Sequence, residues 1–139
     1  MLNKGGGLKM KKLLLIILLT LISTGAMAEW NLADYTDEVT FYFETTSIRK
    51  KADIATLWVL SDYKKPVKIS NNPYLSDKSK VSYDCENESR KFLSIIQYEE
   101  NMGKGKVVRD FDYSDTHTYS AVPPGSVDAT LMKIACGMK

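Results

Sequence analysis

Residues 79–98, SKVSYDCENESRKFLSIIQY, carry the pattern that most limits what this chain can fold into. A polar turn at residues 86–89 separates two arms in which side chains alternate between two faces. Such period-2 alternation, with aromatic and β-branched residues, is typical of β-strands. The segment therefore predicts a hairpin. Its first arm places Val81, Tyr83 and Cys85 on one face, and its second arm places Leu93, Ile95 and Gln97 on one face and Phe92, Ser94, Ile96 and Tyr98 on the other.

The N-terminal residues 1–28 have the pattern of a secretory signal peptide. Three lysines (Lys9, Lys11 and Lys12) precede an apolar run over residues 13–22, and Ala26-Met27-Ala28 forms a small-residue cleavage site. The run is about half of the ~20 residues that a membrane helix needs, which disfavours the alternatives of a membrane anchor or a buried helix.

Cleavage between Ala28 and Glu29 would leave residues 29–139 as a single mature domain, and Met10 is an alternative start. No cysteine lies near the cleavage site, so we expect no lipid anchor and no membrane span after cleavage. The 19 basic residues of the chain less the four lysines of residues 1–28 leave 15, against 17 acidic residues. A mature charge near −2 gives no reason to expect a nucleic acid or an anionic membrane as partner.

The chain contains two cysteines, Cys85 in the hairpin and Cys136 near the C-terminus. In an exported chain, two cysteines indicate one disulfide formed in an oxidising compartment, although two separate thiols are an alternative. The bond would fasten the C-terminal segment to the hairpin. Closing a loop of about 50 residues is valued at roughly 4 kcal/mol by the chain-entropy model.

Other segments also have strand-like patterns. Residues 39–45 alternate with one apolar face, and residues 106–111 have a similar pattern. Residues 54–63 are apolar on both faces, which suits a central strand better than a short buried helix because β-branched and aromatic residues dominate. Pro66 is expected to end that strand, since proline has no N–H for the ladder. A short edge strand is predicted around Tyr119.

Polar segments between these strands are interpreted as connections. We expect residues 29–38 to be a loose lead-in that packs Trp30 on the core, and residues 71–78 to be a surface loop. The basic residues Arg49-Lys50-Lys51 are expected to form a solvated turn rather than a binding patch. Residues 99–105 are expected to form a loop in which glycines adopt positive φ.

The C-terminal segment has the signals of a short helix. Ser126 suits the N-cap, Asp128 lies in the first turn, and Gly137 suits the position after the last turn. The apolar residues Val127, Leu131, Ile134 and Ala135 form one stripe at helical spacing. Cys136 lies off this stripe, so either the last turn unwinds or the buried face is broader than the stripe.

No motif in the sequence indicates catalysis. His117 is the single histidine, and its polar loop favours an exposed side chain over a catalytic one. Two distant cysteines do not form a zinc site. The segment Gly103-Lys104-Gly105-Lys106 lacks the spacing of a phosphate-binding loop and precedes a strand. We therefore expect no enzyme activity, no cofactor and no metal.

Several landmarks, taken in order, resemble one known family. They are Phe41-Tyr42-Phe43 with Thr46-Ser47-Ile48, Leu57 to Tyr63, Ser79-Lys80 before Tyr83-Asp84-Cys85, Arg90, Tyr98 before Gly103-Lys104-Gly105, Val122-Pro123-Pro124-Gly125-Ser126, and Cys136. This set resembles the surface-adhesin protein E family of Gram-negative bacteria. The resemblance implies an α+β fold: an antiparallel sheet of about six strands with a C-terminal helix packed on one face and tethered by the disulfide.

The resemblance also implies a function, which is the binding of host extracellular-matrix proteins by a non-catalytic protein. It places the contact region around the first cysteine, with Lys78, Lys80, Arg90 and Lys91 as cationic contacts. The missing lipidation cysteine favours an alternative: a soluble periplasmic envelope protein, either an inhibitor or an accessory subunit, with a bacterial partner. An exposed sheet edge would allow a homodimer.

Overall fold

The structure is a computed structural model that describes residues 28–69 and 71–138. The signal peptide predicted for residues 1–28 therefore lies, apart from Ala28, outside the described residues. The described elements are β1 (Trp30–Tyr35), β2 (Val39–Glu44), the 3₁₀ turn η1 (Thr45–Ser47), β3 (Arg49–Lys51), β4 (Ile54–Val67), β5 (Tyr74–Asp84), β6 (Ser89–Tyr98), the 3₁₀ turn η2 (Asn101–Gly103), β7 (Val107–Asp112), β8 (Ser120–Ala121) and helix α2 (Val127–Cys136).

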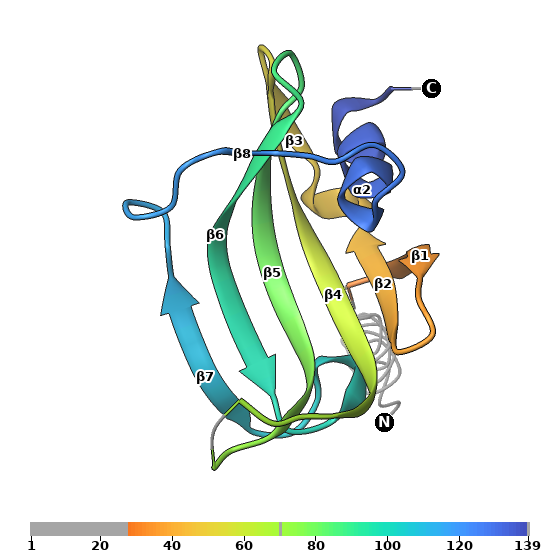
Figure 1. Ribbon diagram of the computed structural model, residues 1–139, viewed down its shortest axis with the longest axis vertical. Coiled ribbons are helices and arrows are strands. Elements are labelled where there is room, and N and C mark those ends of the chain that lie inside the picture. Colours follow the sequence, from red (N-terminus) through yellow and green to blue (C-terminus); the bar gives the residue numbers. More distant parts are fainter. Residues whose placement is uncertain (1–27, 70, 139) are drawn as a thin grey trace, which may run out of the picture.

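The strands form one antiparallel sheet in the order β1-β2-β4-β5-β6-β7, which confirms the predicted fold class (Figure 1). Two short strands extend this path: β3 pairs with β4 beyond the end of β2, and β8 pairs with β6 beyond the end of β7. The long central strands β4, β5 and β6 therefore form the frame on which the rest of the chain is placed.

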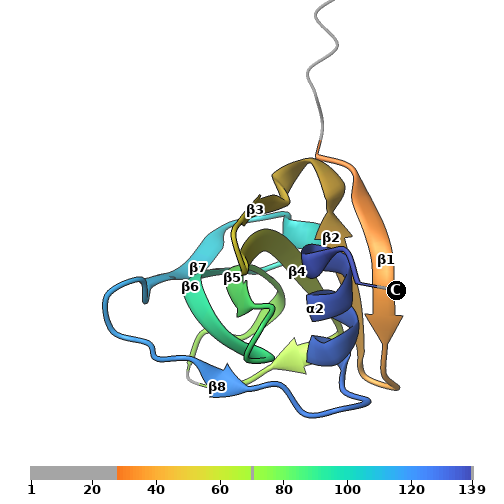
Figure 2. The same ribbon diagram turned by 90° about the horizontal axis from the view of Figure 1, so that it is seen from above.

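The sheet bends around α2, as Figure 2 shows from above. We call the side on which the helix packs the helix face and the opposite side the outer face. Buried apolar side chains gather on the helix face, and they include Leu57 and Val81 of the sheet and Leu131 and Ala135 of the helix. The predicted α+β arrangement thus has its core between one helix and one curved sheet.

Helix α2 has the predicted caps. The Ser126 hydroxyl accepts a hydrogen bond from the Ala129 N–H at 3.1 Å, and Gly137 is left-handed at φ 66°. The helix continues through Cys136 without unwinding, because its buried face is broad and contains Leu131, Met132, Ala135 and Cys136.

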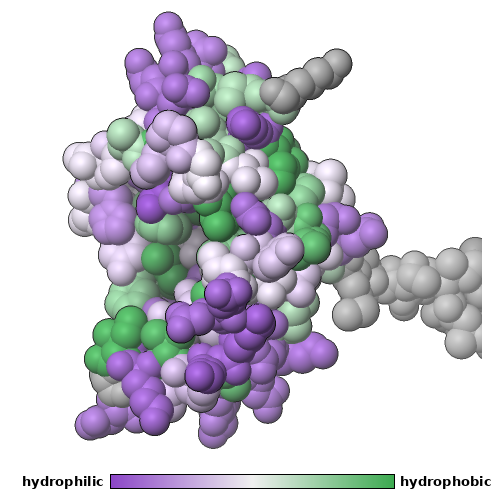
Figure 3. Space-filling model, turned by 45° about the vertical axis from the view of Figure 1, so that its right-hand side comes forward, coloured by the Kyte–Doolittle hydropathy of each residue, from purple (hydrophilic) through white to green (hydrophobic). Residues whose placement is uncertain are grey.

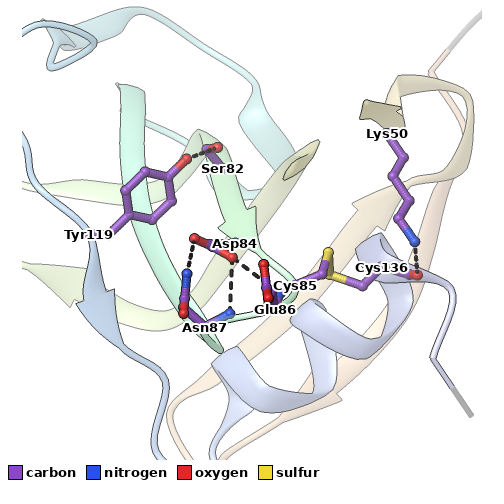
Figure 4. Close-up of a disulfide and its surroundings, with 8 residues drawn as sticks. All are labelled: Lys50, Ser82, Asp84, Cys85, Glu86, Asn87, Tyr119 and Cys136. Carbon is purple, nitrogen blue, oxygen red and sulfur yellow. Dashed lines mark hydrogen bonds between the residues drawn. A yellow bond between two sulfur atoms is a disulfide. The ribbon is translucent and has the colours of Figure 1, made fainter. Parts of the chain in front are cut away.

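The disulfide joins Cys85 at the end of β5 to Cys136 at the end of α2, with 5.9 Å between the Cα atoms (Figure 4). The pairing expected from the cysteine count is therefore present. The same end of the helix is held a second time, because the Lys50 ammonium donates to the Cys136 carbonyl at 3.0 Å. Two links of different chemistry thus fix the helix C-terminus.

The prediction of a loose lead-in at residues 29–38 is wrong, because most of it forms β1. The register between β1 and β2 shifts between Leu32 and Asp34. This irregularity interrupts the alternation by which a strand is recognised in a sequence. The solvated turn predicted at Arg49–Lys51 is also wrong, since these exposed residues form β3 and pair with β4.

The surface loop predicted at residues 71–78 is wrong over most of its length, because β5 begins at Tyr74. Pairing with β4 on one side and β6 on the other buries the polar side chains of Ser76 and Asp77. Strand β4 ends at Val67, one residue beyond Pro66, and its pairing with β5 is irregular between Asp62 and Val67. Proline is tolerated at such irregularities, where its missing N–H breaks no regular ladder.

The β5–β6 hairpin is present as predicted, but two of its residues depart from the predicted faces. Lys80 pairs with Ser94 and Val81 pairs with Phe92, so Leu93 is an extra residue in β6. A bulge of this kind reverses the alternation on its far side. Phe92 therefore shares the helix face with Ile95, and its predicted grouping with Ser94 is wrong. The predicted grouping of Leu93 with Ile95 is wrong as well, because Leu93 lies beside Ser94 and Ile96 on the other face.

Candidate functional site

The four cations expected from the resemblance lie on two different faces. Lys78 and Lys80 of β5 are paired with Ile96 and Ser94, and Lys91 of β6 is paired with Ser82. Because paired residues point to the same side of a sheet, these three lysines share the outer face. Arg90 pairs with Tyr83 on the helix face. The structure therefore brings the three lysines together and separates Arg90 from them.

Aromatic rings accompany two of the three lysines. The Lys78 ammonium lies 5.7 Å from the centre of the Trp30 ring and 5.1 Å from that of Tyr98. The Lys91 ammonium lies 5.1 Å from the Tyr119 ring, and the Tyr119 hydroxyl forms a hydrogen bond with Ser82 at 2.8 Å. Such contacts attract a cation to the face of the ring. They hold these ammonium groups at the surface.

The third lysine, Lys80, makes no hydrogen bond or ion pair with any described residue. It lines an open groove of about 610 Å³ on the outer face, together with Ser94 of β6 and Asp112 of β7. We call Lys78, Lys80 and Lys91 with Trp30, Tyr98 and Tyr119 the lysine–aromatic surface. Asp110 and Asp112 lie in the same groove, but among the described residues neither forms an ion pair with these lysines.

Arg90 has a structural partner. Its Nε donates to the Asp128 carboxylate at 2.6 Å, and its guanidinium lies 4.5 Å from the Phe92 ring. The Tyr83 hydroxyl donates to the same carboxylate at 3.3 Å. Burial, with the nearby Asp128 charge, raises the pKa of Tyr83 above its usual range. Arg90 and Tyr83 together hold the first turn of α2 on the sheet.

A second feature is a cavity of about 480 Å³ on the helix face, between the first turns of α2 and strands β2, β4, β5 and β6. Figure 3 shows hydrophobic side chains along the middle of the molecule, between two polar ends. The cavity wall is partly apolar and partly polar. Its lining residues are Phe41, Val59, Ser61, Tyr63, Tyr74, Asp77, Ser79, Val81, Phe92, Ile95, Gln97, Ser126, Val127, Asp128 and Leu131.

Asp77 is the most unusual of these lining residues, because it is a carboxylate that is only 6% exposed. It accepts hydrogen bonds from the Tyr63 hydroxyl at 2.8 Å and from the Ser79 hydroxyl at 3.1 Å. Burial raises the pKa of Asp77, and these hydrogen bonds oppose the rise. Burial also raises the pKa of Tyr63.

Sequence reasoning did not find this cavity. The sequence pattern predicts a loop at Asp77 and the end of a strand at Tyr63. The local signal was the alternation of Ser76, Lys78 and Lys80 with Asp77 and Ser79, which continues the β5 pattern toward the N-terminus. Because both faces of this segment carry polar residues, the alternation gives no apolar pattern by which the strand could be recognised.

The sole histidine lies in the connection between β7 and β8. His117 is exposed and stacks on Tyr113 with 4.0 Å between the ring centres. It borders an open recess of about 340 Å³, but its ring makes no hydrogen bond with a described serine or carboxylate. A histidine that activates a nucleophile needs such a partner, so the geometry gives His117 no catalytic arrangement.

Within residues 28–69 and 71–138, no group of three or more side chains is suited to holding a metal ion. In the same ranges, no helix has the length and apolar character needed to cross a membrane.

Comparison of the sequence with models of known protein families gives a match. Residues 30–137 match the family described as Surface-adhesin protein E. The chain belongs to this family. Among curated proteins, no sequence matches it.

Solved structures of Haemophilus influenzae protein E have the same fold as this member of the family. One, in crystal form II, superposes with a TM-score of 0.56 at 13% identity, covering 81% of this chain and 97% of that one. Another, from non-typeable Haemophilus influenzae, has a TM-score of 0.56 at 14% identity, covering 82% of this chain and 79% of that one. At this identity the likeness concerns the fold alone.

Proposed function

We propose that this chain is an exported, non-catalytic binding protein that adheres to a protein partner through the lysine–aromatic surface. Membership of the surface-adhesin protein E family supports this class of function. The partner that we propose is an acidic segment of a host extracellular-matrix protein.

The observation that carries the proposal is the set of lysines on the outer face. Lys78 and Lys91 are held against aromatic rings, and Lys80 has no ion-pair partner among the described residues. Lysines that form no ion pair within their own protein attract an acidic partner and speed its association. Aromatic rings beside them add the apolar contact area that is enriched in protein interfaces.

The test is binding of the purified protein to immobilised matrix proteins. The double variant Lys78→Glu/Lys80→Glu should weaken binding by about tenfold or more, because it makes two of the three lysines repel an acidic partner. A tenfold loss of affinity corresponds to about 1.4 kcal/mol. The wild-type affinity should also fall as salt is added. The matched control is Lys51→Glu/Lys65→Glu, an equal change of charge at two exposed positions, one in β3 and one in β4. Equal binding by all three proteins would exclude the lysine–aromatic surface as the contact.

Location decides between the adhesin and the alternative periplasmic function. Protease treatment of intact cells should remove the protein if it lies on the outer surface, as we propose. Full protection, together with that of a periplasmic control, would favour the alternative of a soluble envelope protein with a bacterial partner. N-terminal sequencing of the exported protein would test the expected cleavage between Ala28 and Glu29.

We further propose that a homodimer forms through a sheet edge. Strands β1 and β7 end the strand order, and an edge strand offers backbone groups for pairing with a second copy. Light scattering of the purified protein would give twice the mass of one chain. A mass of one chain across the working concentrations would exclude the dimer.

A further inference from the structure

The helix-face cavity contains a buried carboxylate that has no cation beside it. Asp77 is 6% exposed, and among the described residues it has no ion-pair partner. Its hydrogen bonds come from the neutral hydroxyls of Tyr63 and Ser79. A buried charge without an opposite charge is costly, and proteins usually pair it or use it.

The charges around the cavity do not neutralise Asp77. The other carboxylate in its wall, Asp128, is paired with Arg90. Arg109 of β7 donates to the Gln97 side chain at 3.4 Å and to the Asn72 carbonyl at 2.7 Å. No lysine, arginine or histidine is among the residues that line the cavity.

Part of the remaining wall is apolar and aromatic, and the rest is formed by polar side chains such as Ser61 and Gln97. Phe41 and Phe92 come from the sheet, and Val127 and Leu131 come from the helix. The volume of about 480 Å³ lies within the range of small-molecule sites, roughly 300–1,000 Å³. Such sites combine apolar and aromatic side chains with placed polar groups, and this cavity has both kinds.

We propose that this cavity binds a small molecule with a cationic amine on an apolar body, whose ammonium group pairs with Asp77 and whose body contacts Phe41 and Phe92. The ammonium would supply the positive charge that the fold does not provide. This site lies on the opposite face of the sheet from the lysine–aromatic surface. The two proposals can therefore fail independently.

The test compares three ligands of similar shape by calorimetry or NMR titration of the purified protein. The amine is phenethylamine, the neutral analogue is phenethyl alcohol, and the anionic analogue is hydrocinnamate. We expect the amine to bind at least about tenfold more tightly than the alcohol, because a charge-assisted pair exceeds a neutral contact, and hydrocinnamate to bind least. Equal affinity for the three ligands, or no binding of the amine, would overturn the proposal.

A variant pair locates the site. Asp77→Asn keeps the shape of the side chain and should remove the preference for the amine while leaving the binding of the alcohol unchanged. Asp110→Asn, an equal change at an exposed position of β7, should leave the preference intact. A preference that survives in Asp77→Asn, or disappears in Asp110→Asn, would overturn the assignment to Asp77.

A pH series on the wild type gives the same answer without a variant. Binding of the amine should weaken as pH falls, because protonated Asp77 cannot pair with it. Tyr63, Tyr74 and Asp128 also line the cavity, and Arg90 and Arg109 lie beside it. The affinity for the neutral alcohol, measured at the same pH values, shows how much these other groups change the cavity, and the ratio of the two affinities removes that change. A ratio of amine to alcohol affinity that is constant with pH would contradict the proposal.

Discussion

The Asp128 carboxylate in the first turn of α2 accepts a hydrogen bond from Arg90 Nε of β6 at 2.6 Å. The other end of the helix is joined to β5 by the disulfide between Cys85 and Cys136. The ten-residue helix is therefore held on the sheet at both ends. A helix this short depends on such contacts, because isolated helices below about 12 residues are marginal in water.

Removing the ion pair should loosen the N-terminal end of α2. We expect Asp128→Ala to lower the free energy of unfolding by about 1–3 kcal/mol, since it removes hydrogen bonds to a charged group. A double-mutant cycle with Arg90→Ala, measured by chemical denaturation, isolates the coupling of the pair. Exposed pairs couple by about 0.2–1 kcal/mol, so we expect a value near or above the top of that range. A coupling near zero would contradict the role given to the pair.

Removing the disulfide should loosen the other end. Cys85→Ser/Cys136→Ser should lose roughly 4 kcal/mol of stability according to the chain-entropy model. Thermal unfolding of the wild type with and without a reductant should show a large drop in Tm, and the double serine variant should not respond to the reductant. An unchanged Tm on reduction would show that the bond contributes little to stability.

Asp77 should make stability depend on pH with an unusual sign. Its folded-state pKa lies above the ordinary value of 3.8, so at pH values between the two the folded state keeps a proton that the unfolded state has lost. The free energy of unfolding should therefore fall as pH rises through this window, and it should not recover above the folded pKa.

The variant Asp77→Asn isolates this effect from other carboxylates, such as Asp84, whose pKa is lowered by hydrogen bonds from Asn87. The free energy of unfolding of Asp77→Asn minus that of the wild type should be larger at neutral pH than at pH 4, which is about the ordinary pKa of aspartate. Denaturant unfolding of both proteins across this range is the measurement. Curves that stay parallel would contradict the raised pKa.

Gly103 is predicted to be sensitive to substitution. It adopts φ +66°, and a Cβ there would overlap the Lys78 Cε atom. Gly103→Ala should cost about 1–2 kcal/mol for the left-handed backbone and should also displace Lys78 from Trp30. The control is Gly125→Ala, where φ is +72° and no other atom lies within 4 Å of the added Cβ.

Only the first of these two glycine variants should change Trp30 fluorescence and binding through the lysine–aromatic surface. Both should lose similar stability in thermal unfolding. If both leave fluorescence and binding unchanged, Lys78 does not depend on Gly103 for its position.

The sequence by itself determined the elements whose signals are local. The caps at Ser126 and Gly137 set the ends of α2, and the alternation across residues 79–98 set the β5–β6 hairpin. With two cysteines in the chain, the disulfide had one pairing to adopt. These signals work because each depends on neighbours a few residues away.

Tertiary structure decided which side chains meet. Asp77 is buried because strands β4 and β6 pair on either side of β5, and its hydrogen bond from Tyr63 comes from 14 positions away. A bulge at Leu93 turned Phe92 toward the cavity and placed Lys91, rather than Arg90, on the same face as Lys80. Polar residues buried by partners distant in the chain leave no apolar pattern of their own, so the sequence placed the hairpin but not the cavity within it.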